Sequence, residues 1–317
     1  MTHFSSNKLP EACRAFARSN TSLSDWTTFR IGGRAAVVLQ VCDPADLQRV
    51  LAALRMAEVP RVLLGGGSNI LAADDAIEAA VVVYRSDAPP RVQSHAGIWE
   101  VNAGVILDTA VDVSIGGGFC GLEELSGIPG TLGGAVVGNC GAFGREMSET
   151  VAWAEVLDVA GTVQRMKPEE LVFSYRDSVL KGRDLTVLRV GLRLAEAKDD
   201  HPRQRRSEIL HLRYSKHPDY TTLPTAGSYF KNIVDPKDGS RSAAGKLLDA
   251  CGARGMSHGD AAVFEKHANI LVNTGAARAA DVLALQQKLQ GLVLQRFGVT
   301  LQREVRYLGS DGVFDAC

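Results

Sequence analysis

Residues 63–71 read LLGGGSNIL, an apolar run that leads directly into a short polar loop. The loop consists of Gly65, Gly66, Gly67, Ser68 and Asn69. Because glycine has no Cβ, successive backbone amides can turn toward one concavity, which suits phosphate oxygens, and the serine and asparagine add side-chain donors. Neither a Walker loop nor a Rossmann fingerprint follows. A glycine turn that merely ends a strand is the simpler alternative.

A second glycine-rich segment, GLEELSGIPGTLGGAVVGNCGAFG, occupies residues 121–144. Its permissive positions would be poor in a helix or strand interior. They are Gly127, Pro129, Gly130, Gly133, Gly134, Gly138, Gly141 and Gly144. A chain tolerates so many of them mainly where it wraps a large ligand. Two such segments fit a dinucleotide with a pyrophosphate better than a small substrate.

The sequence around the first loop predicts alternating strands and a helix. Residues 35–41, 59–66 and 79–84 are apolar runs typical of buried strands. Between the first two, Asp43 can cap a helix whose first position is Pro44. Pro89 and Pro90 then indicate a joint between lobes.

Beyond the joint, we expect strands at 99–105 and 185–194, a helix at 107–115, and further strands from Trp153 onward. The polar stretch 196–208 predicts an exposed crossing between lobes. Its basic half is flanked by acids and lacks aromatic residues, which favours a solvated face over a nucleic-acid patch.

The last part of the chain, from about Arg213, predicts helices of its own and one strand. Residues 279–297 carry leucines and valines at helical spacing, and residues 299–309 alternate like a strand.

Composition is that of a globular protein with more than one lobe. The chain has 317 residues, a net charge of -1 and 45% hydrophobic residues. The balanced charge disfavours nucleic-acid and polybasic membrane binders. Six scattered cysteines without a C-x-x-C pair predict reduced thiols and no metal site. We expect neither a signal peptide nor a membrane span, and therefore a cytoplasmic protein.

Three polar motifs could carry chemistry. FSYRDS (173–178) offers the fixed donor fork of Arg176, although such a trio is more often a surface ion pair. TAGSYFKN (225–232) places Gly227 before Ser228, so the hydroxyl can sit at a tight turn facing a cleft. Glu304 lies in the alternating stretch, where the simpler expectation is a solvent-facing carboxylate.

Together these segments resemble the UDP-N-acetylenolpyruvoylglucosamine reductase (MurB) family, in the family's own order and over about residues 20–309. LLGGGSNIL resembles its flavin pyrophosphate loop and SGIPGTLGGAVVGNCGAFG its second flavin segment. YRDS resembles the active-site arginine motif and GSYFKN the serine motif. NTSLSDWTTFRIGG resembles the opening motif, and KHANILVN and LQREVRYLG the closing ones.

The resemblance implies an α+β fold: a two-lobed FAD-binding fold of the vanillyl-alcohol-oxidase type plus a C-terminal α/β substrate-binding domain. We expect boundaries at 1–88, 89–205 and 206–317. FAD would be bound without a covalent link, with NADPH as reductant. The implied FAD contacts are Gly65, Gly66, Gly67, Ser68, Asn69, Gly127, Ile128, Pro129, Gly130 and Gly134.

The resemblance also implies Arg176, Ser228 and Glu304 as catalytic residues and Tyr175 and Asn232 as substrate contacts. The reaction would reduce UDP-N-acetylglucosamine enolpyruvate to UDP-N-acetylmuramate in peptidoglycan precursor synthesis, a step on which cell shape and division depend. Arg176 and Glu304 would stabilise the enolate that forms on the substrate, Glu304 by a hydrogen bond if protonated, and Ser228 would protonate it.

Two features depart from the common pattern of the family that the chain resembles. Ile233 follows Asn232, where a proline is common. The stretch between YRDS and GSYF is short and resembles the second type, which lacks the substrate-covering tyrosine loop.

Other classes stay open on the sequence. They are another FAD-linked oxidoreductase of this fold with a different substrate, such as an oxidase that passes electrons to oxygen, and a non-catalytic binding module. A structural or interaction protein would not need two glycine-rich segments.

Overall fold

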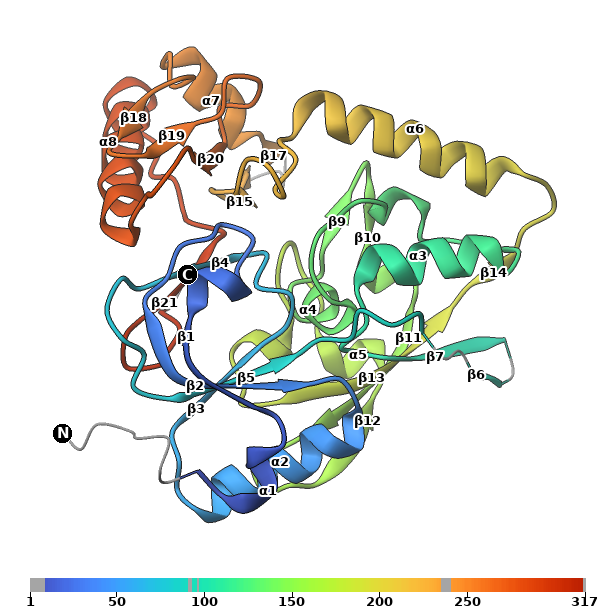
Figure 1. Ribbon diagram of the computed structural model, residues 1–317. Helices are drawn as coiled ribbons and strands as arrows, with labels where there is room; N and C mark the ends of the chain where they lie inside the picture. Colours follow the sequence, from blue (N-terminus) through green and yellow to red (C-terminus); the bar gives the residue numbers. More distant parts are fainter. Residues whose placement is uncertain (1–8, 91–92, 96, 235–240, 316–317) are drawn as a thin grey trace.

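The computed structural model describes residues 9–90, 93–95, 97–234 and 241–315. Three sheets organise these residues into three lobes, and a long helix crosses from the second lobe to the third (Figure 1). No helix in the described ranges is long and apolar enough to cross a membrane.

The first lobe is a four-stranded sheet in the order β1-β2-β5-β3. Its strands are β1 (Ala17–Ser22), β2 (Arg34–Val41), β5 (Ala80–Tyr84) and β3 (Arg61–Leu64). β2, β5 and β3 run parallel, while β1 pairs with β2 antiparallel. β5 is buried along its whole length, as a central strand of the apolar sequence AVVVY should be.

Helices α1 (Glu11–Arg14) and α2 (Pro44–Met56) belong to this lobe. The Asp43 carboxylate accepts a hydrogen bond from the Ala45 amide at 2.8 Å, and Pro44 occupies the first turn. This start confirms the predicted cap.

The second lobe is an antiparallel sheet in the order β12-β11-β13-β7-β6. Its strands are β12 (Val163–Met166), β11 (Val151–Leu157), β13 (Thr186–Arg193), β7 (Ile98–Asn102) and β6 (Gln93–His95). Helices α3 (Leu107–Gly116), α4 (Leu132–Val137) and α5 (Pro168–Leu171) accompany it. Its short elements are β8 (Phe119–Cys120), η3 (Glu123–Leu125), β9 (Gly141–Ala142), β10 (Arg145–Glu146), η4 (Met147–Glu149), η5 (Val179–Lys181) and β14 (Ala195–Glu196). One continuous core joins this lobe to the α2 side of the first sheet.

The third lobe is an antiparallel sheet in the order β15-β20-β19-β18. Its strands are β15 (Thr225–Ser228), β20 (Ile270–Asn273), β19 (Ala261–Val263) and β18 (Ser257–His258), beside the pair β16 (Ile233–Val234) and β17 (Arg241–Ser242). Helices α7 (Ala244–Ala250) and α8 (Ala279–Phe297) pack here. α8 confirms the predicted long helix, and Gly298 ends it in a left-handed conformation.

The chain then returns to the first lobe, which the sequence did not predict. β21 (Arg306–Leu308) pairs in parallel with β4 (Ile70–Ala72), directly after the first glycine loop. The expected strand at 299–309 is therefore wrong in extent, because only its last part finds a partner. Glu304 lies just before it and only 16% of its side chain is exposed, so the expectation of a solvent-facing carboxylate is also wrong. The predicted lobe boundaries stay a proposal.

The stretch 196–208 is exposed and crosses between lobes, as predicted, but the sequence analysis did not anticipate a helix there. Its second half begins α6 (His201–Lys216), which spans the distance between the second and third lobes (Figure 1). The helix is easily missed because it is mostly exposed and carries few apolar residues. Only Pro202 and Ile209 are buried. Its ion pairs anchor it to the second lobe instead, for example Arg206 to Asp108 at 2.6 Å.

Candidate functional site

A cavity of about 1050 Å³ lies where the three lobes meet. Both glycine-rich segments line it. The turn that carries Arg176, the end of β15 and the residues before β21 also contribute to the lining. All fifteen predicted site residues line this one cavity: Gly65, Gly66, Gly67, Ser68, Asn69, Gly127, Ile128, Pro129, Gly130, Gly134, Tyr175, Arg176, Ser228, Asn232 and Glu304.

The two glycine segments touch each other through backbone. A Cβ on Gly66 would lie 2.6 Å from the Gly130 Cα, and one on Gly65 would lie 2.4 Å from Thr131 Oγ1. A Cβ on Gly130, whose φ is +116°, would lie 2.6 Å from Ser68 Oγ. Two segments more than fifty residues apart therefore form one cavity wall, and at Gly66 and Gly130 backbone packs directly on backbone.

This wall fits a long ligand with a pyrophosphate. The cavity has the volume of a large ligand site, and the wall presents backbone rather than bulky side chains. Beside the second glycine segment, Arg213 donates from Nε to the Ser126 carbonyl, while its buried Nη2 has no hydrogen-bond partner among the described residues. A buried unpaired guanidinium nitrogen favours an acceptor on a bound ligand. Gly127 is one of the predicted FAD contacts, but its amide already donates to Asp108 Oδ1 at 2.7 Å.

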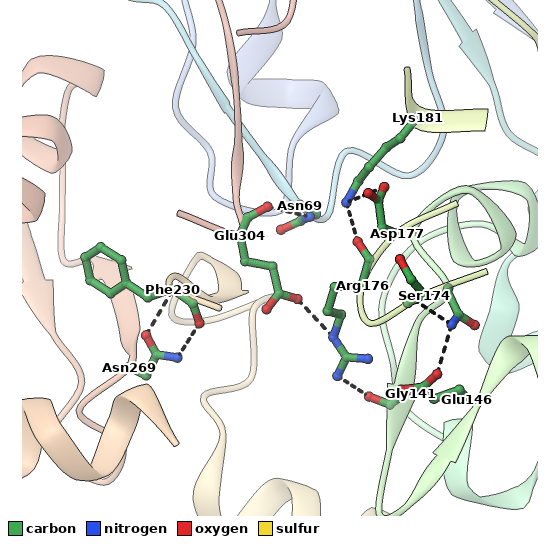
Figure 2. Close-up of polar contacts among 11 residues, drawn as sticks. Asn69, Gly141, Glu146, Ser174, Arg176, Asp177, Lys181, Phe230, Asn269 and Glu304 are labelled. Carbon is green, nitrogen blue, oxygen red and sulfur yellow. Dashed lines mark hydrogen bonds and ion pairs between the residues drawn. The ribbon is translucent and has the colours of Figure 1, made fainter. Parts of the chain in front are cut away.

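Arg176 faces the cavity from the tip of a tight turn. Its Nε lies 3.1 Å from Glu304 Oε1, and one terminal nitrogen donates to the Gly141 carbonyl at 2.5 Å (Figure 2). Only 23% of the side chain is exposed. The alternative of a surface ion pair within the Tyr-Arg-Asp trio is thus wrong, because the partner comes from the far end of the chain.

The backbone of Glu304 is held by two hydrogen bonds, one to a side chain and one to another backbone group. Asn69 Nδ2 donates to its carbonyl at 3.2 Å, and its own amide donates to the Tyr229 carbonyl at 2.8 Å. Burial raises the pKa of the Glu304 carboxyl above its usual value, although Arg176, Lys181 and Lys231 oppose the shift. Burial of a carboxylate disfavours the charged form, so this group keeps a proton to higher pH than an exposed glutamate.

Ser228 ends β15, immediately after Gly227, whose φ of +81° gives the tight turn that the sequence predicts. Asn269 fixes the residues that follow (Figure 2). Its Oδ1 accepts from the Phe230 amide at 3.0 Å and its Nδ2 donates to the Phe230 carbonyl at 2.9 Å. Since Tyr229 also bonds to Glu304 through backbone, Ser228 and Glu304 are held in one rigid frame.

The two predicted substrate contacts also reach the cavity. The Tyr175 ring centre lies 5.2 Å from the Arg176 guanidinium carbon. Asn232 Oδ1 accepts a hydrogen bond from the Ala244 amide at the start of α7, at 3.2 Å. This bond orients the Asn232 amide at the third-lobe wall.

That wall is basic, which sequence reasoning did not anticipate. Lys246, Arg254 and Lys266 line it, together with His217 and His267, whose ring centres are 5.5 Å apart. Burial lowers the pKa of His217 to about 4 and that of His267 below its usual value, so both rings are neutral near pH 7. Clustered lysine and arginine side chains suit the phosphates of a nucleotide sugar.

Sequence reasoning also missed the polar residues behind the catalytic set. Lys181, Asn139 and Asn269 bond to the backbone of the Arg176 and Ser228 segments. Their targets are carbonyls and amides distant in sequence or across a turn, and no spacing rule points to such contacts.

No group of three or more potential metal ligands exists among the described residues. The five described cysteines are free thiols, and the sixth, Cys317, lies outside the described residues.

Two family models match the chain. Residues 35–167 match an FAD binding domain, and residues 217–308 match the C-terminal domain of UDP-N-acetylenolpyruvoylglucosamine reductase. The first match spans both glycine segments and the second spans Ser228, Asn232 and Glu304.

Curated relatives and a solved structure indicate the same family as the model that matches residues 217–308. UDP-N-acetylenolpyruvoylglucosamine reductase of Chloroherpeton thalassium is 35% identical over 95% of this chain and 96% of its own length. The enzyme of Heliobacterium modesticaldum is 37% identical over 92% of this chain and 90% of its own. The crystal structure of the Thermus caldophilus enzyme (MurB) superposes with a TM-score of 0.74 at 33% identity, covering 92% of this chain and 99% of the other.

Proposed function

This chain belongs to the UDP-N-acetylenolpyruvoylglucosamine reductase family, and we propose that its substrate is UDP-N-acetylglucosamine enolpyruvate. It is an oxidoreductase, a UDP-N-acetylmuramate dehydrogenase, that performs the reduction step of peptidoglycan precursor synthesis with FAD as cofactor and NADPH as reductant. The observation that carries the substrate assignment is the buried contact between Arg176 and Glu304 beside the glycine wall.

The residues of the glycine wall would hold FAD. Gly65 to Asn69 and Gly127 to Gly134 would offer backbone groups to the pyrophosphate, and the unpaired nitrogen of Arg213 would supply a donor to the ligand. Bound there, FAD supplies the hydride chemistry that links NADPH to the vinyl carbon of the enolpyruvyl group.

The protein's own task is to stabilise the charge that develops on the substrate. When the vinyl carbon is reduced, negative charge appears beside the carboxylate and spreads into it as an enolate. The planar fork of Arg176 donates toward that charge, and its orientation is set by the Gly141 carbonyl and Glu304. Glu304, buried and with a raised pKa, donates a hydrogen bond when protonated.

Ser228 would then give the proton that completes the product. A hydroxyl is a weak acid, but an enolate is a strong base, and transfer within hydrogen-bond distance suffices. The backbone bond from Glu304 to Tyr229 ties the Ser228 segment to the Glu304 segment, and all three predicted catalytic residues line the same cavity. Tyr175 and Asn232 would contact the substrate, and the basic wall of the third lobe would receive its diphosphate.

We also propose a cytoplasmic location, because NADPH and nucleotide sugars are made and used there.

The first test is an anaerobic absorbance experiment on the purified protein. We expect a flavin spectrum that bleaches with NADPH and returns with UDP-N-acetylglucosamine enolpyruvate. A flavin that bleaches but ignores the sugar would refute the substrate, and fast reoxidation by air alone would favour an oxidase of the same fold.

The second test separates the role of Ser228. Ser228→Ala should leave bleaching by NADPH unchanged and slow reoxidation by the sugar about a hundredfold, because it removes only the proton donor. The matched control is Ser207→Ala, an exposed serine of α6. Stopped-flow traces in which flavin reduction and flavin reoxidation slow equally would exclude Ser228 as the proton donor.

A further inference from the structure

The turn that carries Arg176 has an unusual backbone. Ser174 and Asp177 pair with each other through two backbone hydrogen bonds of 3.0 and 3.1 Å, so Tyr175 and Arg176 are the two central residues. The φ of Arg176 is +57°. Two-residue turns with positive φ at the second central position favour glycine there. An arginine in this left-handed conformation costs roughly 1–2 kcal/mol.

A buried lysine meets the backbone at this point. Lys181, the last residue of η5, donates from Nζ to the Arg176 carbonyl at 2.5 Å (Figure 2). Its Nζ also lies 3.9 Å from Asp177 Oδ1. Only 16% of the Lys181 side chain is exposed, against 52% for Asp177. A lysine is seldom buried without a specific partner, so the contact with the Arg176 carbonyl accounts for its burial.

Other bonds hold the same turn from behind. Asn139, which is buried, donates from Nδ2 to the Ser174 carbonyl at 2.9 Å. Ser178 Oγ donates to the Val137 carbonyl at 2.7 Å. These two bonds fix the base of the turn. Lys181 is the side chain that bonds to Arg176 itself, on the main chain, while the guanidinium reaches Gly141 and Glu304.

We propose that Lys181 is a positioning residue for the reduction, because its ammonium group holds the Arg176 backbone left-handed and so aims the guanidinium at the enolate. The inference rests on the proposed function of Arg176. Without Lys181, the Arg176 carbonyl loses its charged donor and the turn can relax toward a backbone of ordinary φ. Rotation of the peptide would swing the side chain away from the Gly141 carbonyl and from Glu304.

The first measurement compares the two halves of the reaction in Lys181→Met, which keeps the length and apolar stem but removes the donor. We expect reoxidation by the enolpyruvyl sugar to slow roughly ten- to a hundredfold, the scale of a small misplacement of a catalytic group. Flavin reduction by NADPH should stay within about twofold of the unmodified enzyme. Lys288→Met, at an exposed position of α8, is the control and should change neither half. Unchanged reoxidation in Lys181→Met would overturn the proposal.

A double-mutant cycle separates positioning from direct contact. If Lys181 acts through Arg176, adding Lys181→Met to Arg176→Ala should cost less than about twofold, because the group it positions is already gone. An equal loss in both backgrounds would mean that Lys181 touches the substrate itself, and the proposal would be wrong. Should Lys181→Met fold poorly, Lys181→Gln, which keeps a neutral donor, enters the same cycle.

A crystal structure of Lys181→Met gives a readout that does not depend on turnover. We expect residue 176 to leave the left-handed region and its guanidinium to lose the Gly141 carbonyl. An unchanged turn would refute the inference even if the enzyme were slow. If the unmodified enzyme ignored the enolpyruvyl sugar, the proposed function would fail, while this structure would still decide whether Lys181 sets the Arg176 turn.

Discussion

The cavity has two walls built on different principles. The glycine wall, formed by residues 65–69 and 127–134, lines the cavity largely with backbone and depends on glycines where its two segments touch. The catalytic wall, formed by Arg176, Ser228 and Glu304, depends on side chains whose supports are mostly backbone groups elsewhere in the chain. One added carbon atom, the Cβ of an alanine, can disturb the glycine wall. The catalytic wall is disturbed when one of its existing side chains moves.

The difference predicts which half of the reaction a mutation affects. If the glycine wall binds FAD as proposed, damage to it should remove FAD and with it both half-reactions. Damage to the catalytic wall should leave FAD binding and flavin reduction by NADPH intact and should slow flavin reoxidation by the sugar. A variant of the catalytic wall that loses FAD would erase this distinction.

The largest effect is expected for Gly66→Ala. Its Cβ would lie 2.6 Å from the Gly130 Cα, and because backbone cannot move aside as a side chain can, the two loops must separate. We expect purified protein with little flavin absorbance and no turnover. Gly116→Ala is the control, since a Cβ there meets nothing within 4 Å. Full FAD occupancy in Gly66→Ala would contradict the idea that close loop contact makes the site.

Arg176→Lys should have the second-largest effect, and the loss of rate should be confined to the half-reaction with the sugar. The charge is kept, but an ammonium cannot reproduce a planar fork that bonds both the Gly141 carbonyl and Glu304. We expect reoxidation by the sugar to slow on the order of a hundredfold or more, with normal reduction by NADPH. A near-normal oxidative half in stopped-flow traces would show that charge alone is enough.

Glu304→Gln tests the catalytic wall through the pH dependence of the half-reaction with the sugar. The raised pKa of Glu304 keeps the acid protonated to higher pH, and the rate should fall as pH rises through that pKa and the donor is lost. Glutamine donates at every pH, so the variant should retain a measurable rate and lose this fall. The check is the pH profile of the oxidative half-reaction in both proteins. An unchanged slope in the variant would assign the titration to another group.

The smallest effect concerns the basic wall of the third lobe. The folded pKa of His217, about 4, lies below its usual 6.5, so the unfolded chain takes up a proton first as pH falls. This contribution to stability is complete above about 6.5 and is lost between there and about 4. His217→Gln should reduce that loss by roughly 2 kcal/mol or less, as followed by thermal or urea unfolding. His211→Gln, at an exposed site on α6, should not change it.

Much of the fold could be read from local patterns. The strands at 35–41 and 79–84, the capped helix at Pro44 and the helix at 279–297 are confirmed because each carries its own periodicity and end signals. α6 and the extent of β21 could not be read in this way. α6 has little apolar periodicity because most of its side chains face solvent or form ion pairs, and β21 is a strand only where β4 accepts it.

The sequence by itself determined the family, the cofactor class and the residue types available for the chemistry, since glycine-rich loops and ordered polar motifs are local properties of the chain. Only the tertiary structure brought Arg176 to Glu304, 128 positions away in the printed sequence, buried that pair, and set Lys181 against the Arg176 carbonyl. The physical reason is that burial and pairing depend on which segments the fold brings together. A shifted pKa or a held left-handed turn arises from those neighbours and leaves no periodic trace along the chain.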